Sequence, residues 1–338
     1  MSAISELESE LARLLPARRR PQADVLTAAR RWSEAVWTAA AAAGPGELSA
    51  AESERGLALG ARPVFVCGVH RSGTTLVRDL LDAHPSLAVL PSEGSFRHDA
   101  GLAEVGREWV RRLANPINQP PYWLLGRSGP EGSPYVDFAR LLAAWWGETR
   151  ERPLVAVALA YASCRGLEGV ERWVEKTPGN ERRLDRLCAD FPAAKVVQVV
   201  RHPMAVLASR KRIEEIATGA FRCRRRVLED LVRSYEVAAA PREGHWVLRY
   251  EDLVADVEGT ADRLAAFLGI APLPELRRPT VAGQPAFSNS SFASAGEAGL
   301  VRPAAADFHA EVLTAAERRR LAARVGASAA GLGYRLGR

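Results

Sequence analysis

The stretch VFVCGVHRSGTTLVRDLLDAHP, residues 64–85, constrains the fold of this 338-residue chain more than any other feature of the sequence. Residues 63–69 are a short apolar run between a proline and a glycine-containing loop, and such a run predicts a buried strand. The leucines after Gly73 are spaced to lie on one face of a helix. A strand, a glycine loop and a helix N-terminus in this order predict an anion site, because the first backbone N–H groups of a helix have no partner within it.

The residues of this loop limit the kind of anion that it can bind. The spacing from Gly68 to Gly73 matches the first half of the ATP- and GTP-binding pattern G-x-x-x-x-G-K-[ST], but Thr74 stands where that pattern has lysine. The cation here is Arg71, and a guanidinium can donate two parallel hydrogen bonds to phosphate or sulfate oxygens. We therefore expect a compact anion that is held without a magnesium ion. An ordinary strand-to-helix turn that binds nothing is the alternative interpretation.

A second stretch, VVQVVRHPMAVLASRKR at residues 196–212, has the features of another anion site. Arg201 follows a buried strand, at the edge where open α/β sheets bind their ligands, and Pro203 suits the first turn of the next helix. Ser209 lies further along this helix, where its hydroxyl can face a ligand near Arg201. Taken alone, the stretch is also typical of a solvated helix start that is rich in basic residues.

Runs typical of strands alternate with runs typical of helices along most of the remaining chain. After the first strand, further strands are expected within residues 172–178, 194–203 and 245–253, with helix-like sequence between them. Such alternation indicates a parallel sheet with helices on both of its faces. We therefore predict an α/β fold, with an open parallel sheet of the P-loop type that is flanked by helices.

The regions outside these strands predict a division into two parts. Residues 1–60 have apolar side chains at helical spacing, with one helix expected at about 22–43, and predict a helical N-terminal extension. This extension is expected to end in a linker rich in glycine, proline and serine. Residues 61–338 are then the α/β domain, with helical insertions within residues 97–170.

The composition is that of an ordinary globular enzyme, with 47% hydrophobic and 25% charged residues. The net charge of +6 is too small to predict nucleic-acid binding, and it fits either solvated arginine-rich faces or a field that attracts an anionic ligand. The cysteines show neither a C-x-x-C pair nor metal-ligand spacing, which predicts free thiols in a reducing compartment. We find no signal-peptide core and no apolar run of membrane-spanning length, so we expect a cytoplasmic protein.

Together, RSGTTL at residues 71–76 and RHPMAVLAS at 201–209 resemble the two halves of the nucleotide site in sulfotransferases that use 3′-phosphoadenylyl sulfate (PAPS). The resemblance is closest to the bacterial and tyrosylprotein-type branch and covers roughly residues 63–335. Further similar pieces stand in the order of that family: EKTPGN at 175–180, FPAAKVVQVVRHP at 191–203, LRYEDLVAD at 248–256, AAFLGI at 265–270, and NSSF at 289–292 with Arg302 after it.

The resemblance implies that the donor nucleotide is the co-substrate, that no metal is required, and that particular residues hold each part of the donor. The loop residues that would hold the phosphosulfate are Arg71, Ser72, Gly73, Thr74 and Thr75. The residues implied for the rest of the nucleotide are Arg201 and Ser209 at the 3′-phosphate, Tyr250 at the adenine, and Ser290 or Ser291 with Arg302 as the remaining shell. Lys176 would lie near the bridging oxygen or the sulfate.

The implied reaction is an in-line displacement at sulfur, which needs a base for the proton of the acceptor. A positioned base typically contributes about 10²–10⁴-fold. Glu93 stands where the tyrosylprotein-type branch carries its catalytic glutamate, and His98 and His70 are the alternatives. The loop departs from the cytosolic small-molecule branch, which has lysine at Arg71, and from the tyrosylprotein branch, in which proline is frequent at His70.

The acceptor is less well specified by the sequence. The expected acceptor is a hydroxyl or amine of a small metabolite, glycan or natural product, with no nucleic-acid partner; a homodimer is compatible with the sequence. Aromatic residues within the helical insertions fit either an acceptor pocket or an ordinary core. They are Trp109, Tyr122, Trp123, Tyr135, Trp145 and Trp146.

Two alternative functions fit the same fold. A small-molecule kinase of the P-loop type would need a lysine after Gly73 and an aspartate for magnesium at a strand end, and neither is evident. A non-catalytic nucleotide-binding protein would keep the anion sites and bind the bisphosphate product without turnover.

Overall fold

The computed structural model describes residues 3–15, 23–94, 100–114, 121–166, 168–222, 224–286, 298–301 and 308–336. The chain divides into two compact units, which we describe one at a time. The first unit consists of Met1–Arg62, Pro85–Trp173 and Val281–Ala286, and the second of Pro63–His84, Val174–Thr280 and Phe287–Arg338. The predicted division at residue 60 into an extension and one domain stays a prediction.

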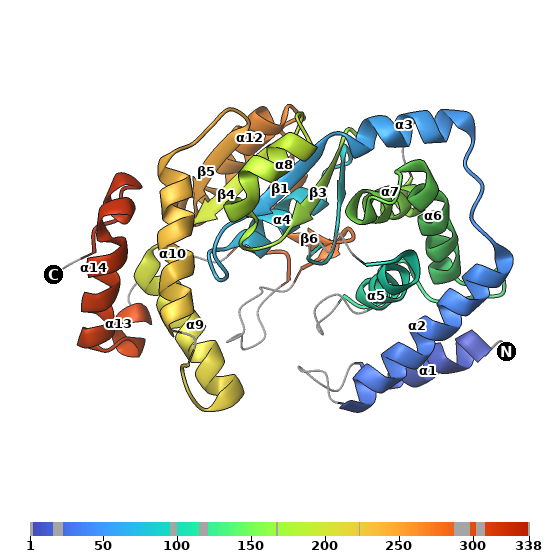
Figure 1. Cartoon of the computed structure of the whole chain (residues 1–338), viewed down its shortest axis with the longest axis horizontal. Helices are drawn as coiled ribbons and strands as arrows, with labels where there is room; N and C mark the ends of the chain where they lie inside the picture. Colours follow the sequence, from blue (N-terminus) through green and yellow to red (C-terminus); the bar gives the residue numbers. More distant parts are fainter. Residues whose placement is uncertain are drawn as a thin grey trace. The chain divides into compact units, whose positions relative to one another are not determined.

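A five-stranded sheet has the strand order β2-β3-β1-β4-β5. The strands are β1 (Pro63–Cys67), β2 (Leu87–Val89), β3 (Arg172–Lys176), β4 (Lys195–Val200) and β5 (His245–Arg249). Strands β1 and β4 are parallel, and so are β4 and β5. The predicted α/β fold with a parallel sheet is therefore confirmed (Figure 1).

The end of β5 differs from the prediction. The strand ends at Arg249, and the short helix α11 (Tyr250–Ala255) begins directly after it, where the sequence predicted strand as far as residue 253. Glu251 and Asp252 lie in the first turn of α11, where carboxylates interact favourably with the helix dipole. This early end places Tyr250 at the start of a helix, at the carboxyl edge of the sheet.

The helices of the second unit follow the predicted alternation, with three unpredicted helices at residues 224–239, 250–255 and 308–312. They are α4 (Thr74–Asp82), α8 (Leu184–Asp190) after a 3₁₀ turn at Asn180–Arg183, α9 (Pro203–Thr218), α10 (Arg224–Ala239), α11, α12 (Val257–Leu268), a second 3₁₀ turn at Pro274–Arg277, α13 (Phe308–Val312) and α14 (Ala315–Gly331). The sequence did not predict α10, although Val227, Leu231 and Tyr235 recur at helical spacing and are buried. In Figure 1, α9 and α10 (yellow) lie with α13 and α14 (red), and these helices pack on one another.

The first unit is mostly helical. Its helices are α1 (Ala3–Leu14), α2 (Ala23–Ala43), α3 (Ala50–Gly60), α5 (Leu102–Ala114), α6 (Pro134–Glu148) and α7 (Pro153–Arg165). The N-terminal segment was expected to end in a linker. This prediction is wrong in part, because helix α3 lies between the break at Gly44 and the start of β1. A capping box between Ser49 and Glu52 starts this helix by satisfying N–H groups at its first turn. The strands β6 (Thr280–Val281) and β7 (Gln284–Pro285) form a separate two-stranded sheet.

Several aromatic residues of the first unit belong to its core. Trp109, Tyr135 and Trp145 are 3%, 0% and 0% exposed, so the core interpretation is confirmed for them. The Tyr135 ring packs edge to face on Trp32 with centroids 4.9 Å apart, and Trp145 Nε1 donates to Ser163 Oγ at 3.0 Å. No helix within the described parts of the chain is both long and apolar enough to cross a lipid bilayer.

Candidate active site

The loop after β1 is fixed by its neighbours in the second unit. A Cβ atom on Gly68 would lie 2.2 Å from the carbonyl oxygen of Val199, so only glycine fits there beside β4. The backbone N–H of Gly68 donates to the carboxylate of Glu181 at 2.9 Å, and its carbonyl accepts from the N–H of Gly179 at 3.0 Å. Gly179, within EKTPGN, and Glu181, directly after it, therefore hold both polar backbone groups of Gly68.

Within the loop, the backbone turns so that arginine takes a conformation that is unusual for it. Arg71 has φ +78° and Gly73 has φ +105°, both in the left-handed region. Ser72 is 1% exposed, and both its hydroxyl and its N–H donate to the carbonyl oxygen of Val69, at 2.7 and 3.0 Å. Ser72 thus shapes the loop in this conformation, while α4 begins at Thr74 with its N-terminus at the loop.

The two predicted anion motifs meet at the carboxyl edge of the sheet. Arg71 Nε donates to Ser209 Oγ at 3.1 Å, across 138 positions of the chain. Arg201 Nη1 donates to the carbonyl oxygen of Arg71 at 3.2 Å, and its guanidinium lies 4.5 Å from the centroid of the Tyr250 ring. Four residues that the sequence assigned to one nucleotide are therefore in direct contact.

The electrostatics of this cluster favour an anion. Burial, together with the charges of Arg201 and Arg210, lowers the pKa of the Arg71 guanidinium from its ordinary value. An arginine keeps its proton at neutral pH, so these cations repel one another at close range. A bound phosphate or sulfate would relieve that repulsion and accept hydrogen bonds from the same groups.

Tyr250, directly after β5, packs closely against the loop at Gly73. A Cβ atom on Gly73 would lie 2.4 Å from Cδ2 of the Tyr250 ring, so glycine is needed for close approach as well as for its φ. The ring is thus held between the loop and the Arg201 guanidinium. A planar ring in this place is suited to stack on a base.

Lys176 ends β3 and is 4% exposed. Burial raises the pKa of Asp79 on α4 to about 6, and the charges of Arg78 and Lys176 act against that rise. Glu175, directly before the lysine, accepts a hydrogen bond from Asn180 Nδ2 at 3.1 Å. The lysine is thus set in a buried network at the strand end.

Glu93 lies in the first unit, in the loop that follows β2, and is half-buried. Arg112 of α5 donates to its backbone carbonyl oxygen, and the same guanidinium lies 5.4 Å from the centroid of the Trp109 ring. The loop that carries the candidate base is therefore held by a hydrogen bond from α5. Of the other candidates, His70 is exposed, and His98, Ser290, Ser291 and Arg302 lie outside the described residues.

The profile of the sulfotransferase family matches residues 63–275. This chain belongs to the sulfotransferase family. The resemblance noted in the sequence is confirmed, and the chain is an enzyme that transfers sulfate. The residues in contact at the sheet edge, Arg71, Arg201, Ser209 and Tyr250, all lie within the matched range.

Solved structures of sulfotransferases are among those that match this chain. The sulfotransferase domain of the olefin synthase from Synechococcus PCC 7002 is 20% identical, with a TM-score of 0.51 over 82% of this chain and 96% of that domain. Sulfotransferase STF1 from Mycobacterium tuberculosis H37Rv is 21% identical, with a TM-score of 0.39 over 82% of this chain and 92% of its own. No curated protein sequence matches.

Three residues that support the contacts among Arg71, Arg201 and Tyr250 in this sulfotransferase were not predicted from the sequence. Glu181, which is 2% exposed, directly follows the EKTPGN motif, and Glu251 stands beside Tyr250 in LRYEDLVAD. Their places directly after one matching motif and inside another were a usable signal. Tyr235, which donates to the carbonyl oxygen of Arg201, lies in the unpredicted helix α10, so the sequence offered no comparable signal for it.

Proposed function

We propose that this sulfotransferase takes a sulfuryl group from 3′-phosphoadenylyl sulfate and passes it to a hydroxyl or amine of a small-molecule, glycan or natural-product acceptor. The observation that carries the proposal is the contact of Arg71 with Ser209 and of Arg201 with the Arg71 backbone. PAPS has two separate anionic groups joined by a nucleoside. Two guanidinium groups beside a helix N-terminus and an aromatic ring fit such a molecule.

The proposed binding roles are those that the family resemblance implies, and the contacts of Arg71 and Arg201 support them. Arg71 and the backbone of residues 72–75 hold the phosphosulfate, and Arg201 with Ser209 holds the 3′-phosphate. Since Arg71 Nε is bonded to Ser209 Oγ, Arg71 can also donate to a 3′-phosphate. Tyr250 contacts the adenine, and the proposal keeps Ser290 or Ser291 with Arg302 as the remaining nucleotide shell.

The proposed reaction is one displacement at sulfur. The acceptor oxygen or nitrogen forms the new bond to sulfur while the bond from sulfur to the bridging phosphate oxygen breaks, and adenosine 3′,5′-bisphosphate leaves. Arg71 and Lys176 stabilise the negative charge that develops on the leaving oxygens. Glu93 takes the proton of the acceptor. Positioning of the reactants and stabilisation of charge supply the remaining rate acceleration, as they do in phosphoryl transfer.

Two features support a sulfuryl donor over a nucleoside triphosphate. Thr74 stands where a triphosphate loop carries the lysine that reaches its terminal phosphates. The cations of the cluster come from Arg71 and Arg201, and neither of them lies at that position. A cytoplasmic location is part of the proposal, because PAPS is expected as a soluble co-substrate.

The test is label transfer from PAPS carrying ³⁵S to acceptor extracts, with EDTA present. We expect labelled product, release of the bisphosphate in equal amount, and no phosphoryl transfer from ATP with magnesium. Phosphoryl transfer from ATP would instead support the kinase alternative. Bisphosphate binding without label transfer to any acceptor would support the non-catalytic alternative, and neither binding nor transfer would contradict the proposed donor.

A further inference from the structure

The peptide unit that joins Arg201 to His202 is held at both of its polar groups. Its carbonyl oxygen accepts a hydrogen bond from the hydroxyl of Tyr235 on α10. Its N–H donates to Glu251 Oε1 at 2.8 Å. A peptide fixed in this way sets the direction in which the Arg201 side chain leaves the end of β4.

The second oxygen of Glu251 connects this peptide to the C-terminal part of the chain. Glu251 Oε2 accepts a hydrogen bond from the hydroxyl of Tyr334 at 2.7 Å. Glu251 directly follows Tyr250, the residue whose ring lies against the Arg201 guanidinium. The Glu251 carboxylate therefore joins Tyr334 to the peptide that follows Arg201, and Glu251 is itself the chain neighbour of Tyr250.

The two phenols are suited to act as hydrogen-bond donors. Tyr334 is 3% exposed and Tyr235 is 1% exposed, and their ring centroids lie 6.2 Å apart. Burial and the charge of Glu251 raise the pKa of both hydroxyl groups above their ordinary value. Both therefore keep their protons at any pH near neutral. The Arg249 guanidinium lies 4.6 Å from the Tyr334 ring centroid and covers its face.

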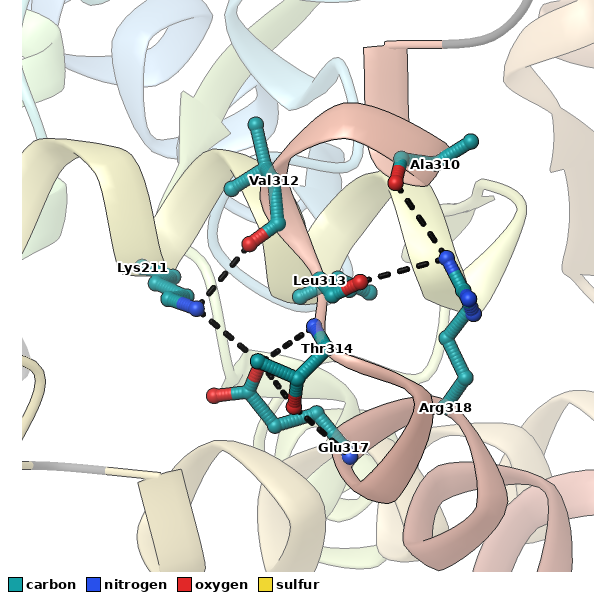
Figure 2. A network of polar contacts seen from close by, with 7 residues as sticks. All are labelled: Lys211, Ala310, Val312, Leu313, Thr314, Glu317 and Arg318. Carbon is teal, nitrogen blue, oxygen red and sulfur yellow. Dashed lines mark hydrogen bonds and ion pairs between the residues drawn. The ribbon is translucent and has the colours of Figure 1, made fainter.

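The segment that carries Tyr334 is anchored to the helix that carries Ser209. Figure 2 shows Lys211 of α9 donating to the carbonyl oxygen of Val312 at 2.9 Å and to Glu317 Oε2 at 3.0 Å. Glu317 also closes a capping box with Thr314 at the start of α14. The ion pair is largely shielded from water, with side chains 13% and 7% exposed.

The rest of α14 packs by one face. Its buried residues recur at every fourth position, which places them in one row along the helix: Glu317, Leu321, Val325 and Ala329. The three apolar residues of this row share a core cluster with Met204 of α9, Tyr235 of α10 and Tyr334. The segment 308–336 is therefore an integral part of the second unit, although the family match ends at residue 275.

We propose that Tyr334 is a positioning residue for the nucleotide site and acts through Glu251 on Arg201 and Tyr250. The inference rests on the proposed function, in which these two residues hold the 3′-phosphate and the adenine. Without the Tyr334 hydroxyl, the Glu251 carboxylate loses one of its two fixed partners and is free to rotate away from the His202 N–H. Arg201 would then sample orientations that do not meet the phosphate.

The test compares Tyr334→Phe with Tyr135→Phe, which removes a hydroxyl from a fully buried tyrosine of the first unit. Calorimetry at a temperature where circular dichroism shows both variants folded measures the Kd for adenosine 3′,5′-bisphosphate. We expect Tyr334→Phe to raise this Kd about 10-fold, the effect of one hydrogen bond to a charged group, and Tyr135→Phe to change it less than about two-fold. A merely structural role would lower the fraction of competent protein and leave Kd unchanged.

A second variant tests the route through Glu251 and covers the case in which Tyr334→Phe does not fold. Glu251→Gln keeps the size of the side chain but weakens both hydrogen bonds, so we expect a similar loss of affinity. In the Tyr334→Phe and Glu251→Gln double variant, the two losses should be less than additive. A wild-type Kd in either folded single variant, or full additivity, overturns the inference. If the wild type itself binds no bisphosphate, the proposed function fails first.

Discussion

The two units of the molecule differ in how their candidate residues are brought into place. In the second unit, Arg71, Arg201 and Tyr250 each follow the end of a parallel strand within a few positions, and the sheet brings those ends together. In the first unit, Glu93 depends on Arg112, nineteen positions away on a helix. The residues proposed for the nucleotide thus stand at strand ends of a regular sheet, whereas the proposed base is held by a contact with a helix.

This difference has a consequence for function. Strand-end motifs keep their geometry as long as the sheet keeps its register, so the same residues can hold one donor in many enzymes. Helices that pack around a core can change their sequence together, which suits a variable acceptor. The comparison predicts that substitutions in the first unit leave bisphosphate binding intact, while substitutions at the strand-end motifs of the second unit weaken it.

The largest expected effect is a loss of turnover when Glu93 of the first unit is replaced. Glu93→Gln should lower kcat by about 10²–10⁴-fold, because the neutral amide cannot take the proton of the acceptor. The Kd for the bisphosphate, measured by calorimetry, should stay unchanged. Glu131→Gln, an exposed carboxylate of the same unit, is the matched control. Turnover like that of the wild type in Glu93→Gln would remove this residue from the mechanism.

The next effect concerns stability rather than chemistry. Trp145→Ala should lower the free energy of unfolding by about 3–5 kcal/mol, because it leaves a cavity among α3, α6 and α7. Trp146→Ala, the half-buried neighbour on α6, should cost less, as denaturant titration can show. If Trp145→Ala instead left stability intact and raised the KM for the acceptor, this residue would belong to a pocket and not to the core.

Gly73→Ala tests the close approach of the Tyr250 ring to the loop backbone in the second unit. The new Cβ would meet the Tyr250 ring in a backbone conformation that costs a non-glycine residue about 1–2 kcal/mol. We expect the bisphosphate Kd to rise at least about 10-fold as the ring is displaced. Gly269→Ala is the control, since Gly269 has φ +72° but nothing within 4 Å of its Cβ position. Equal effects of the two variants on Kd would argue against a role for the ring.

The smallest expected effect is a pH dependence of folding stability that comes from His245 in the second unit. Burial and the charge of Arg242 lower the pKa of His245 from 6.5 to about 4. The unfolded chain therefore binds more protons between these values, and stability should fall by about 1–3 kcal/mol as the pH drops from 6.5 towards 4. His245→Asn should have a flatter curve over this window. Parallel curves for the variant and the wild type would show that His245 does not titrate in this way.

The sequence predicted the strands of the parallel sheet well because their signals are local. Apolar runs marked β1 and β4, and the residues at their ends followed from the direction of the chain. The contact between Arg71 and Ser209 could not be predicted, because the strand order and the rotamers decide it. The helix α10 was missed because its first turn is a run of arginines, and Tyr235 was missed with it. The link from Tyr334 to Glu251 spans 83 positions and has no local signature.

The most direct test of the central claim, that the two arginine motifs form one nucleotide site, is a calorimetric titration of adenosine 3′,5′-bisphosphate. The wild type should bind one equivalent, and Arg201→Ala should raise the Kd about 100-fold, as expected when one partner of a partly buried charged pair is removed. Arg225→Ala, whose side chain is 90% exposed, should bind within about two-fold of the wild type. An unchanged Kd in Arg201→Ala would contradict the claim.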